Sequence, residues 1–219
     1  HRWRRVRMRK DKGILVVVSG FSGAGKGTLM KQLLKTYDNY ALSVSMTTRK
    51  PRVGEEDGRE YFFVSTETFE EKIAQGELVE YARYCDNYYG TPRAYVEKQL
   101  ENGKDVILEI EIQGALKIKE RFPQALLLFV MPPSVKELER RLLGRGTETS
   151  EVIAARLSRA GEEAEGIEKY DYLVINDDLD TCVAQMHALI QGAHNAPLRN
   201  EEFIEEIRAQ LRALSKGEK

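Results

Sequence analysis

The stretch from Gly20 to Thr28 holds the residues whose types and spacing are best suited to chemistry on phosphate groups. It reads Gly20-Phe21-Ser22-Gly23-Ala24-Gly25-Lys26-Gly27-Thr28. Glycines let consecutive backbone N–H groups turn inward without side-chain clashes. These amides form a concave anion site together with the N-terminus of a following helix. Lys26 is placed to reach the β- and γ-phosphates of a bound nucleotide. We therefore predict a P-loop that binds ATP, rather than a chance glycine-rich turn.

The residue after Lys26 departs from the general P-loop pattern, which has Ser or Thr there. Gly27 occupies that position, and Thr28 follows it. This Gly-Lys-Gly-Thr variant resembles the loops of nucleoside-monophosphate kinases, adenylate kinase among them. We expect Mg²⁺ as a cofactor with ATP. Thr28 either contacts this metal, directly or through water, or contacts a phosphate while water completes the metal shell.

A second candidate anion site lies in the segment Thr47-Thr48-Arg49-Lys50-Pro51-Arg52. The guanidinium groups of Arg49 and Arg52, on either side of Pro51, can bind one phosphate through paired, planar hydrogen bonds. A phenol hydroxyl can add a further donor to a phosphate oxygen. Tyrosines are dense in the residues that follow, namely Tyr61, Tyr81, Tyr84, Tyr88 and Tyr89. The alternative is a solvated charged turn beside core tyrosines, and composition alone does not separate the two.

The elements around the P-loop predict a parallel sheet. Residues 13–19 form a β-branched run without polar alternation, as in a strand buried on both faces, and a helical pattern begins at Thr28. Further strands are expected over 105–111, 125–130 and 172–176, and helices over 134–143, 150–165 and 180–193. Ser134 and Ser150 are the expected N-caps of two of these helices. Strands that alternate with helices indicate a mainly parallel sheet covered on both faces, with ligands at the carboxyl ends of its strands.

Residues 41–104 have a different character. Short strand-like pieces alternate there with small helices over 66–75 and 92–102, so we predict an inserted, partly β subdomain. A closing helix over 200–214 carries one apolar face, which we expect to dock against the fold rather than to bind a partner. This face consists of Phe203, Ile204, Ile207, Leu211 and Leu214.

The composition excludes several other classes of protein. Hydrophobic residues make up 42% and charged residues 32% of the 219 residues, which indicates a globular rather than a disordered chain. The net charge of −1 gives no overall field that would attract nucleic acid. Cys85 and Cys182 have no metal-like spacing, and we expect both to be reduced in a cytoplasmic protein. The longest apolar run, 125–131, is too short to span a membrane.

Several further motifs resemble those of one known family, and they occur in the expected order. They are Ser43–Arg52 with Gly54-Glu55, Gly58–Val64, Gly76–Ala82, Asn87–Thr91, Glu109–Gly114, Pro132–Ser134, Arg145–Thr147 and Val174–Asp178. Together with the P-loop they resemble guanylate kinases from about Gly13 to about Ala193. The resemblance implies an α/β fold, with a P-loop NTPase-type parallel sheet flanked by helices, an inserted GMP-binding subdomain and a helical lid. It also implies transfer of the γ-phosphoryl group of ATP to GMP, and to dGMP, giving GDP and ADP.

On the acceptor side, the resemblance assigns roles to individual residues. The positions that hold the GMP phosphate are matched by Arg49, Arg52, Tyr61 and Tyr89. Glu80 matches the carboxylate that takes the guanine edge, and Glu111 matches an acidic position near the exocyclic amine. Ser45 and Thr91 match hydroxyls near guanine O6, and Gly90 belongs to the same GMP-binding motif.

On the donor side, the resemblance adds three arginines and an amide to the P-loop. Arg141, Arg145 and Arg156 match the lid and transfer arginines, and with Lys26 they form the expected catalytic set. Asn176 lies where the family places contacts near adenine. Two departures from the family pattern stand out. Glu109 and Glu111 replace the Asp-Ile-Asp of many members, and Phe21 stands where proline is usual.

The expected organisation of the chain follows from this resemblance and from the pattern of elements. It consists of a basic N-terminal extension (1–12), a core with the P-loop (13–43), a GMP-binding subdomain (44–104), core (105–135), a lid (136–160), and core with C-terminal helices (161–219). The basic segment His1–Lys10 lacks the apolar stretch and cleavage site of a secretory signal, and Met8 is a candidate natural start.

Two alternative functions stay open. A related small-phosphate kinase would act on another nucleotide or on a sugar phosphate, but Glu80 and the segment around Ser45 argue against it. A guanylate-kinase-like scaffold module would bind phosphopeptides in its acceptor groove. Such modules typically lack the competent P-loop that Lys26 and its glycines predict. Nucleic-acid binding through the basic leader has no supporting motif. We expect ATP and GMP as ligands, with no nucleic acid and no membrane as partners.

Overall fold

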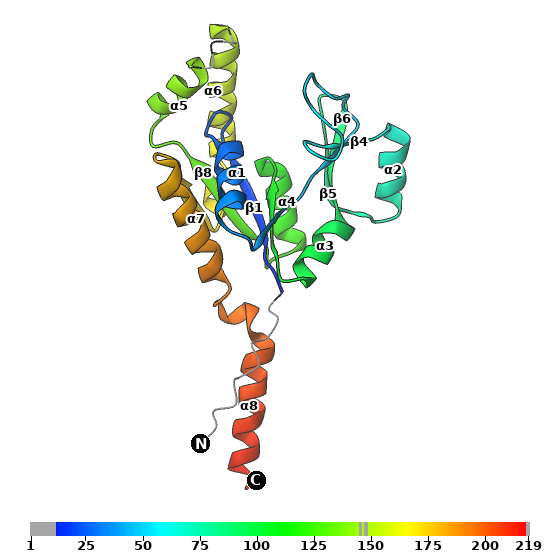
Figure 1. The fold of residues 1–219 in the computed structure, drawn as a ribbon, viewed down its shortest axis with the longest axis vertical. Coiled ribbons are helices and arrows are strands. Elements are labelled where there is room, and N and C mark those ends of the chain that lie inside the picture. Colours follow the sequence, from blue (N-terminus) through cyan, green and yellow to red (C-terminus); the bar gives the residue numbers. More distant parts are fainter. Residues whose placement is uncertain (1–11, 145, 147–148, 218–219) are drawn as a thin grey trace.

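The structure, a computed structural model, describes residues 12–144, 146 and 149–217. It contains a five-stranded parallel sheet covered by helices and a smaller four-stranded sheet set to one side of it (Figure 1). The predicted α/β fold with a parallel sheet flanked by helices is therefore confirmed. The basic segment His1–Lys10 and Arg145 lie outside the described residues.

The central sheet has the strand order β2-β7-β1-β8-β9, and every pair of neighbours is parallel. Its strands are β1 (Leu15–Gly20), β2 (Tyr40–Leu42), β7 (Asp105–Glu109), β8 (Leu126–Met131) and β9 (Tyr172–Ile175). Because β1 lies in the middle, both of its faces are covered, and Val16, Val17 and Val18 are completely buried. This position explains why the strand is a continuous apolar run with no polar alternation.

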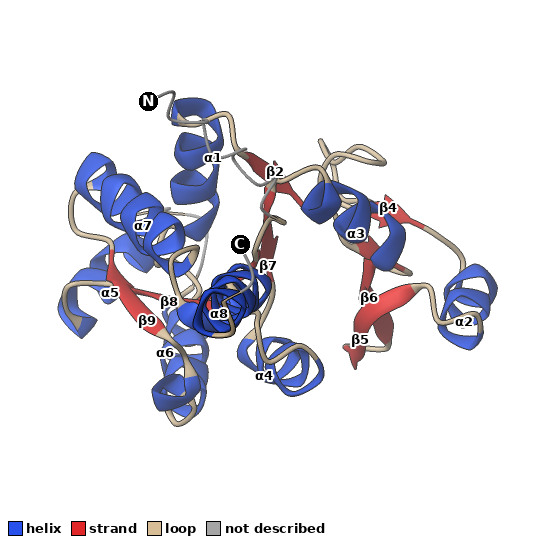
Figure 2. Ribbon diagram, turned by 90° about the horizontal axis from the view of Figure 1, so that it is seen from below, coloured by secondary structure: helices blue, strands red, loops and turns tan. Residues whose placement is uncertain are grey.

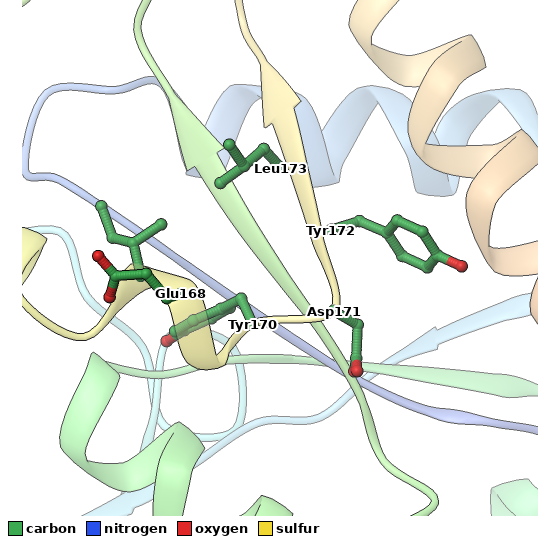
Figure 3. A pocket seen from close by; sticks show the side chains of 6 residues that line it. Glu168, Tyr170, Asp171, Tyr172 and Leu173 are labelled. Atoms are coloured by element: carbon green, nitrogen blue, oxygen red, sulfur yellow. The ribbon is translucent and has the colours of Figure 1, made fainter.

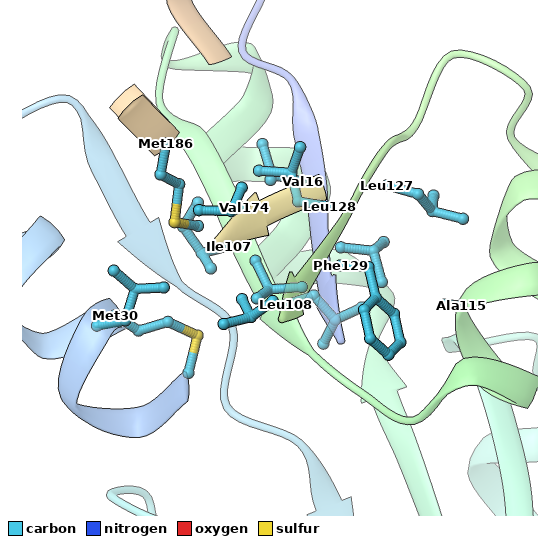
Figure 4. Packing of buried hydrophobic residues seen from close by; sticks show 14 of the residues in the cluster. Val16, Met30, Ile107, Leu108, Ala115, Leu127, Leu128, Phe129, Val174 and Met186 are labelled. Atoms are coloured by element: carbon cyan, nitrogen blue, oxygen red, sulfur yellow. The ribbon is translucent and has the colours of Figure 1, made fainter. Parts of the chain in front are cut away.

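Helices cover both faces of the central sheet. The helices around this sheet are α1 (Lys26–Thr36), α3 (Arg93–Glu101), α4 (Ile112–Arg121), α5 (Val135–Leu143), α6 (Ser150–Ala164) and α7 (Leu179–Ala193). Helices α1 and α7 lie on one face, and α4 and α6 lie on the other (Figure 2). Figure 4 shows Met30 of α1 and Met186 of α7 on one side of the strands and Ala115 of α4 on the opposite side. Close packing on both faces makes the sheet a rigid platform for the loops at its edge.

The inserted sheet has the order β4-β3-β6-β5 and its own small core. Its elements are β3 (Met46–Thr47), β4 (Phe62–Phe63), α2 (Thr66–Ala74), β5 (Leu78–Tyr84) and β6 (Asn87–Pro92). Met46, Phe69 and Leu78 form a hydrophobic cluster separate from that of the central sheet. The chain leaves the central sheet after β2 and returns through α3 to β7, and these two strands are neighbours.

The ends of several elements differ from the sequence-based expectation. Ser134 is the N-cap of α5 as predicted, since its side chain accepts a hydrogen bond from the Glu137 N–H at 3.1 Å. The N-cap predicted at Ser150 is wrong, because Thr149 caps α6 and Ser150 is already helical. The strand expected over 105–111 ends at Glu109, and helix α4, which the pattern did not predict, begins at Ile112.

The closing helix α8 (Glu201–Ser215) projects away from the sheets (Figure 1). It follows the short helix η2 (Pro197–Arg199) and contains no buried residue. The docking predicted for its apolar face is therefore wrong, since Phe203 and Leu214 are exposed. The Asn200 side chain, which donates to the backbone oxygens of His194 and Ala196 at 2.9 Å each, fixes the direction in which α8 leaves α7. Among the described residues, no helix combines the length and apolar character that crossing a bilayer requires.

Candidate active site

The predicted P-loop connects the end of β1 to the start of α1. Gly23 and Gly25 have φ angles of 84° and 87°, in the left-handed region that side chains other than glycine rarely adopt. Gly25 is also the N-cap of α1, and a Cβ atom there would lie 2.6 Å from the Asn176 amide nitrogen. These glycines therefore allow the loop to turn tightly, so that the backbone amides at the start of α1 are presented to an anion.

The Lys26 side chain folds back over this loop. Its Nζ donates to the backbone oxygens of Gly20 at 2.7 Å and Phe21 at 3.1 Å. Burial lowers the pKa of Lys26, and the nearby carboxylates of Glu109 and Glu163 oppose that shift. The ammonium group is thus held at the mouth of the loop with acidic groups near it, ready to exchange carbonyl contacts for phosphate contacts.

Asn176 and Arg141 connect the P-loop to neighbouring elements. The Asn176 amide donates to the Ala24 backbone oxygen at 2.8 Å, and its own backbone oxygen accepts from Arg141 Nη2 at 2.7 Å. Arg141 Nε also contacts Glu137 Oε1 at 3.1 Å within α5. Asn176 therefore contacts the P-loop directly, and Arg141 is connected to it through Asn176. Arg156 lies on α6 and is partly buried.

On the inserted sheet, Arg49 is held by a carboxylate. Arg49 Nη1 and Nη2 donate to the two oxygens of Glu55 at 2.8 and 3.0 Å, and Glu55 Oε1 also accepts from the Arg52 backbone N–H at 2.7 Å. The Arg49 hydrogen bonds, followed by that from Arg52, lower the pKa of Glu55 to about 2. Glu55 therefore stays ionised and fixes the turn that carries both predicted phosphate-binding arginines.

Two tyrosines lie beside this turn. The Arg49 guanidinium carbon is 5.2 Å from the centre of the Tyr61 ring, and the Tyr61 and Tyr89 rings meet edge-on with centres 6.0 Å apart. Burial raises the pKa of Tyr61, so its hydroxyl keeps its proton. The structure thus brings together Arg49, Tyr61 and Tyr89, with Arg52 in the same turn.

Glu80 is a buried carboxylate, with only 5% of the residue exposed. The pairing of β5 with β6 shifts register between Leu78 and Tyr81, and such a bulge re-aims the side chains within it. Glu80 Oε1 accepts from the Thr91 hydroxyl at 3.4 Å, whereas Oε2 has no hydrogen-bond partner among the described residues. Burial raises the pKa of Glu80 to about 7, and the charge of Lys117 opposes that shift.

Helix α4 contributes to the surroundings of this carboxylate, and the other predicted acceptor residues lie on nearby parts of the chain or in the inserted sheet. Gly114, in the first turn of α4, lies against Glu80, and Glu111 precedes the same helix. Gly90 is required by packing, since a Cβ atom there would lie 2.8 Å from the Phe69 ring. Ser45 is partly buried, and its backbone oxygen accepts from the Phe62 N–H at 2.9 Å.

A separate pocket lies at the amino end of β9 and is lined by residues of the segment 167–173 (Figure 3). It contains none of the predicted site residues. Asn176 follows the opposite, carboxyl end of the same strand. The P-loop and Asn176 follow the carboxyl ends of β1 and β9, where ligands of parallel sheets bind, so the pocket is not the candidate active site.

Comparison with known proteins agrees with this geometry. The family model for guanylate kinase matches residues 12–193. The chain belongs to the guanylate kinase family. It is 51% identical over 198 residues to a guanylate kinase of Halalkalibacterium halodurans, covering 90% of this chain and 96% of that protein. It is 52% identical over 193 residues to one from Clostridioides difficile, covering 88% and 94%. The crystal structure of guanylate kinase from Anaplasma phagocytophilum superimposes with a TM-score of 0.70 at 32% identity, covering 86% and 90%.

Membership of the guanylate kinase family confirms the resemblance, the fold and the kinase activity predicted from the sequence. The roles of individual residues stay predictions, as do the proposed boundaries of the subdomains. Arg145 and Thr147 lie outside the described residues, and the lid, with Arg141 in α5 and Arg156 in α6, stays a prediction.

Sequence reasoning did not assign a role to several residues that the structure places beside the predicted site residues. Glu55 belongs to one of the family-like motifs, and its position three residues after Arg52 was the available signal. Lys117 and Arg159 approach acidic residues of the acceptor side from helices α4 and α6. Their helical positions gave no such signal, because contacts between distant elements are not visible in local patterns.

Proposed function

We propose that this member of the guanylate kinase family transfers the γ-phosphoryl group of ATP to GMP, giving GDP and ADP, and that dGMP is an alternative acceptor. The observation that carries the proposal is the buried Glu80 carboxylate, which keeps one oxygen without a hydrogen-bond partner among the described residues. A buried acceptor of this kind requires a donor. Guanine offers two adjacent donors, N1–H and the N2 amine, on a single edge.

On the donor side, the P-loop amides would hold the ATP phosphates and Lys26 would neutralise charge on the group being transferred. The ammonium group, which now donates to the Gly20 and Phe21 carbonyl oxygens, would exchange these contacts for contacts with the phosphates. Phosphoryl transfer depends mainly on alignment and charge stabilisation, because the acceptor phosphate is itself an anion and needs no strong general base.

On the acceptor side, Arg49 and Arg52 would bind the GMP phosphate. Arginine has more N–H donors than Glu55 engages, so the Arg49 guanidinium can keep this carboxylate and still donate to a phosphate. The Tyr61 and Tyr89 hydroxyls would add donors to the same phosphate. Ser45 and Thr91 would lie near guanine O6, and Glu111 near the exocyclic amine.

Mg²⁺ fits the donor side of the site. Thr28 is exposed in the first turn of α1, and Glu109 supplies a carboxylate close enough to act on the Lys26 charge. Among the described residues, no cluster of three or more His, Cys, Asp or Glu side chains could hold a metal by itself. This agrees with Mg²⁺, which commonly binds through substrate phosphates, water and one or two protein groups. When bound, the ion would neutralise charge on the β- and γ-phosphates, with Thr28 as its protein contact, direct or through water.

The predicted lid arginines would act when nucleotide is bound. Arg141 already contacts the Asn176 backbone oxygen beside the P-loop. Arg156 extends from α6, and we assign Arg145 to the same group from its sequence motif. Positive charge that approaches the transferred group lowers the barrier more than it strengthens substrate binding.

A coupled ADP-release assay tests this proposal, with ATP·Mg²⁺ and each nucleoside monophosphate in turn. We expect kcat/KM to be highest for GMP, lower but substantial for dGMP, and near background for AMP, CMP and UMP. A higher value for another monophosphate or for a sugar phosphate would overturn the acceptor assignment. An absence of ADP release with every acceptor, together with binding of a phosphopeptide, would support the scaffold alternative instead.

A further inference from the structure

The Arg159 side chain of helix α6 joins three parts of the molecule. Its Nη1 group donates to the Tyr84 hydroxyl at the end of β5, and its Nη2 group contacts Glu111 Oε2 at 3.3 Å. Its Nε group pairs with Glu163 Oε1 of the same helix at 3.1 Å. The guanidinium carbon also lies 4.8 Å from the centre of the Tyr84 ring. All three guanidinium nitrogens are therefore engaged, and the group lies close to one aromatic ring.

These contacts connect elements that are far apart in the chain. Tyr84 is 75 positions from Arg159 and belongs to the inserted sheet, whereas Glu111 is 48 positions away and precedes helix α4. In the views of Figures 1 and 2, α6 and β5 appear on opposite sides of α4. The Arg159 and Tyr84 side chains span this separation. They form a direct link between the helix of the predicted lid and the inserted sheet.

The link ends at the acceptor-base site. Glu111 acts electrostatically on Glu80, the buried carboxylate assigned above to the guanine edge. Two carboxylates that share a site repel each other, and a cation that pairs with one of them relieves this repulsion. Arginine suits the position, because its planar fork can engage a carboxylate and a phenol at the same time.

We propose that Arg159 is a positioning residue of the acceptor site, which holds Glu111 in place and ties α6 to the inserted sheet through Tyr84. The approach of α6 and the binding of GMP would then favour each other. The inference rests on the proposed function, because it takes GMP as the ligand of this site. It assigns no direct substrate contact to Arg159.

A purely structural role would leave a different signature. The Arg159 and Glu111 side chains are 44% and 39% exposed, and an exposed ion pair contributes little to folding stability. Loss of Arg159 should therefore leave the melting temperature almost unchanged. The loss should instead weaken the binding of GMP and leave the binding of ATP unchanged.

The main variant is Arg159→Met, which keeps the length of the side chain and removes its charge and donors. We expect the KM for GMP and the calorimetric Kd for GMP to rise about fivefold, which corresponds to about 1 kcal/mol at 1.36 kcal/mol per tenfold. The KM for ATP should stay within twofold. Arg159→Lys keeps the charge near Glu111 but loses the fork, so its values should fall between those of the wild type and Arg159→Met.

Tyr84→Phe removes only the hydroxyl and should reproduce part of the rise in the KM for GMP. If the two side chains act through their mutual contact, the double variant should be no worse than Arg159→Met alone. Arg208→Met is the matched control, since Arg208 is an exposed arginine that pairs with Glu205 on the projecting helix α8. This control should leave all constants unchanged.

Three outcomes would overturn the inference. They are GMP constants within twofold of wild type in Arg159→Met, equal rises for GMP and ATP with a lowered melting temperature, and additive effects of the Arg159 and Tyr84 substitutions. Failure of the proposed function would give a different result. The wild-type protein would then transfer no phosphoryl group to GMP and would show no GMP binding by calorimetry.

Discussion

Replacing Glu80 by Gln perturbs guanine recognition with little change in side-chain size. The ionised carboxylate is an acceptor at both oxygens, whereas the amide offers one acceptor and one donor group. The Thr91 hydroxyl already donates a hydrogen bond to Glu80 Oε1 at 3.4 Å. In Glu80→Gln, at least one guanine donor would therefore face either no acceptor or another donor.

The magnitude follows from the burial of this site. A hydrogen bond to a charged, buried group is worth about 1.5–3 kcal/mol, and a buried donor left unpaired costs about 1–3 kcal/mol more. Taking about 3 kcal/mol in total, kcat/KM for GMP should fall roughly 150-fold, at 1.36 kcal/mol per tenfold. AMP lacks the N1–H donor, so the low kcat/KM of the enzyme for AMP should change little.

The measurement is the ratio of kcat/KM for GMP to that for AMP, in wild type and in Glu80→Gln, with the melting temperature as a check on folding. Because Glu80 is buried, a variant that lowers both values equally would point to damage of the fold. An unchanged ratio in a well-folded variant would refute the reasoning, and base recognition would then have to be sought at Ser45, Thr91 and Glu111.

Four further outcomes are expected. Lys26→Met should reduce turnover at least about a hundredfold while circular dichroism stays unchanged, because one charge on the transferred group is worth a few kcal/mol; near-normal turnover would remove Lys26 from the site. Arg49→Ala and Arg52→Ala should weaken GMP binding in calorimetry without affecting ATP, and equal losses would indicate a supporting role. Arg156→Ala should lower kcat more than it changes either KM; a change in KM alone would exclude a role in transfer. Since burial raises the pKa of Glu80 from 4.5 to about 7, the ligand-free folded protein holds a proton there, between these two pKa values, that the unfolded chain has lost, whereas the donors of bound guanine would favour the ionised form. The free energy of unfolding should therefore fall as pH rises through this window. Glu80→Gln should lose that part of the pH dependence, and an unaltered profile in chemical denaturation would contradict the assignment.

The P-loop could be predicted in detail because its geometry depends on local residues. Gly23 and Gly25 adopt positive φ angles that few other residues tolerate, and the buried strand and helix on either side are visible as patterns. The boundary of α1 was less clear from the sequence. Its first turn begins at Lys26, inside the motif itself, rather than at Thr28.

The acceptor side depended more on family resemblance. Nothing in the local pattern of β5 indicates that Glu80 is buried, since its burial results from a bulge opposite β6 and from the approach of α4. The ion pair of Arg159 with Glu111 and the separation of α8 from the sheets are likewise tertiary features. The apolar periodicity of α8 predicted a helix correctly, but periodicity does not show whether a face will be covered.

The adjacency of β2 and β7 has a consequence for how this architecture can diversify. The inserted sheet enters after Leu42 and returns at Asp105, and these positions belong to neighbouring strands whose register pairs Tyr40 with Asp105 and Leu42 with Ile107. The inserted segment therefore begins and ends at neighbouring strands near one edge of the central sheet, and it has its own hydrophobic cluster. Exchange of this module for one of different shape would leave the P-loop and the central sheet intact. Acceptor choice can thus be altered largely within this module, together with Glu111, which precedes α4 and lies outside it.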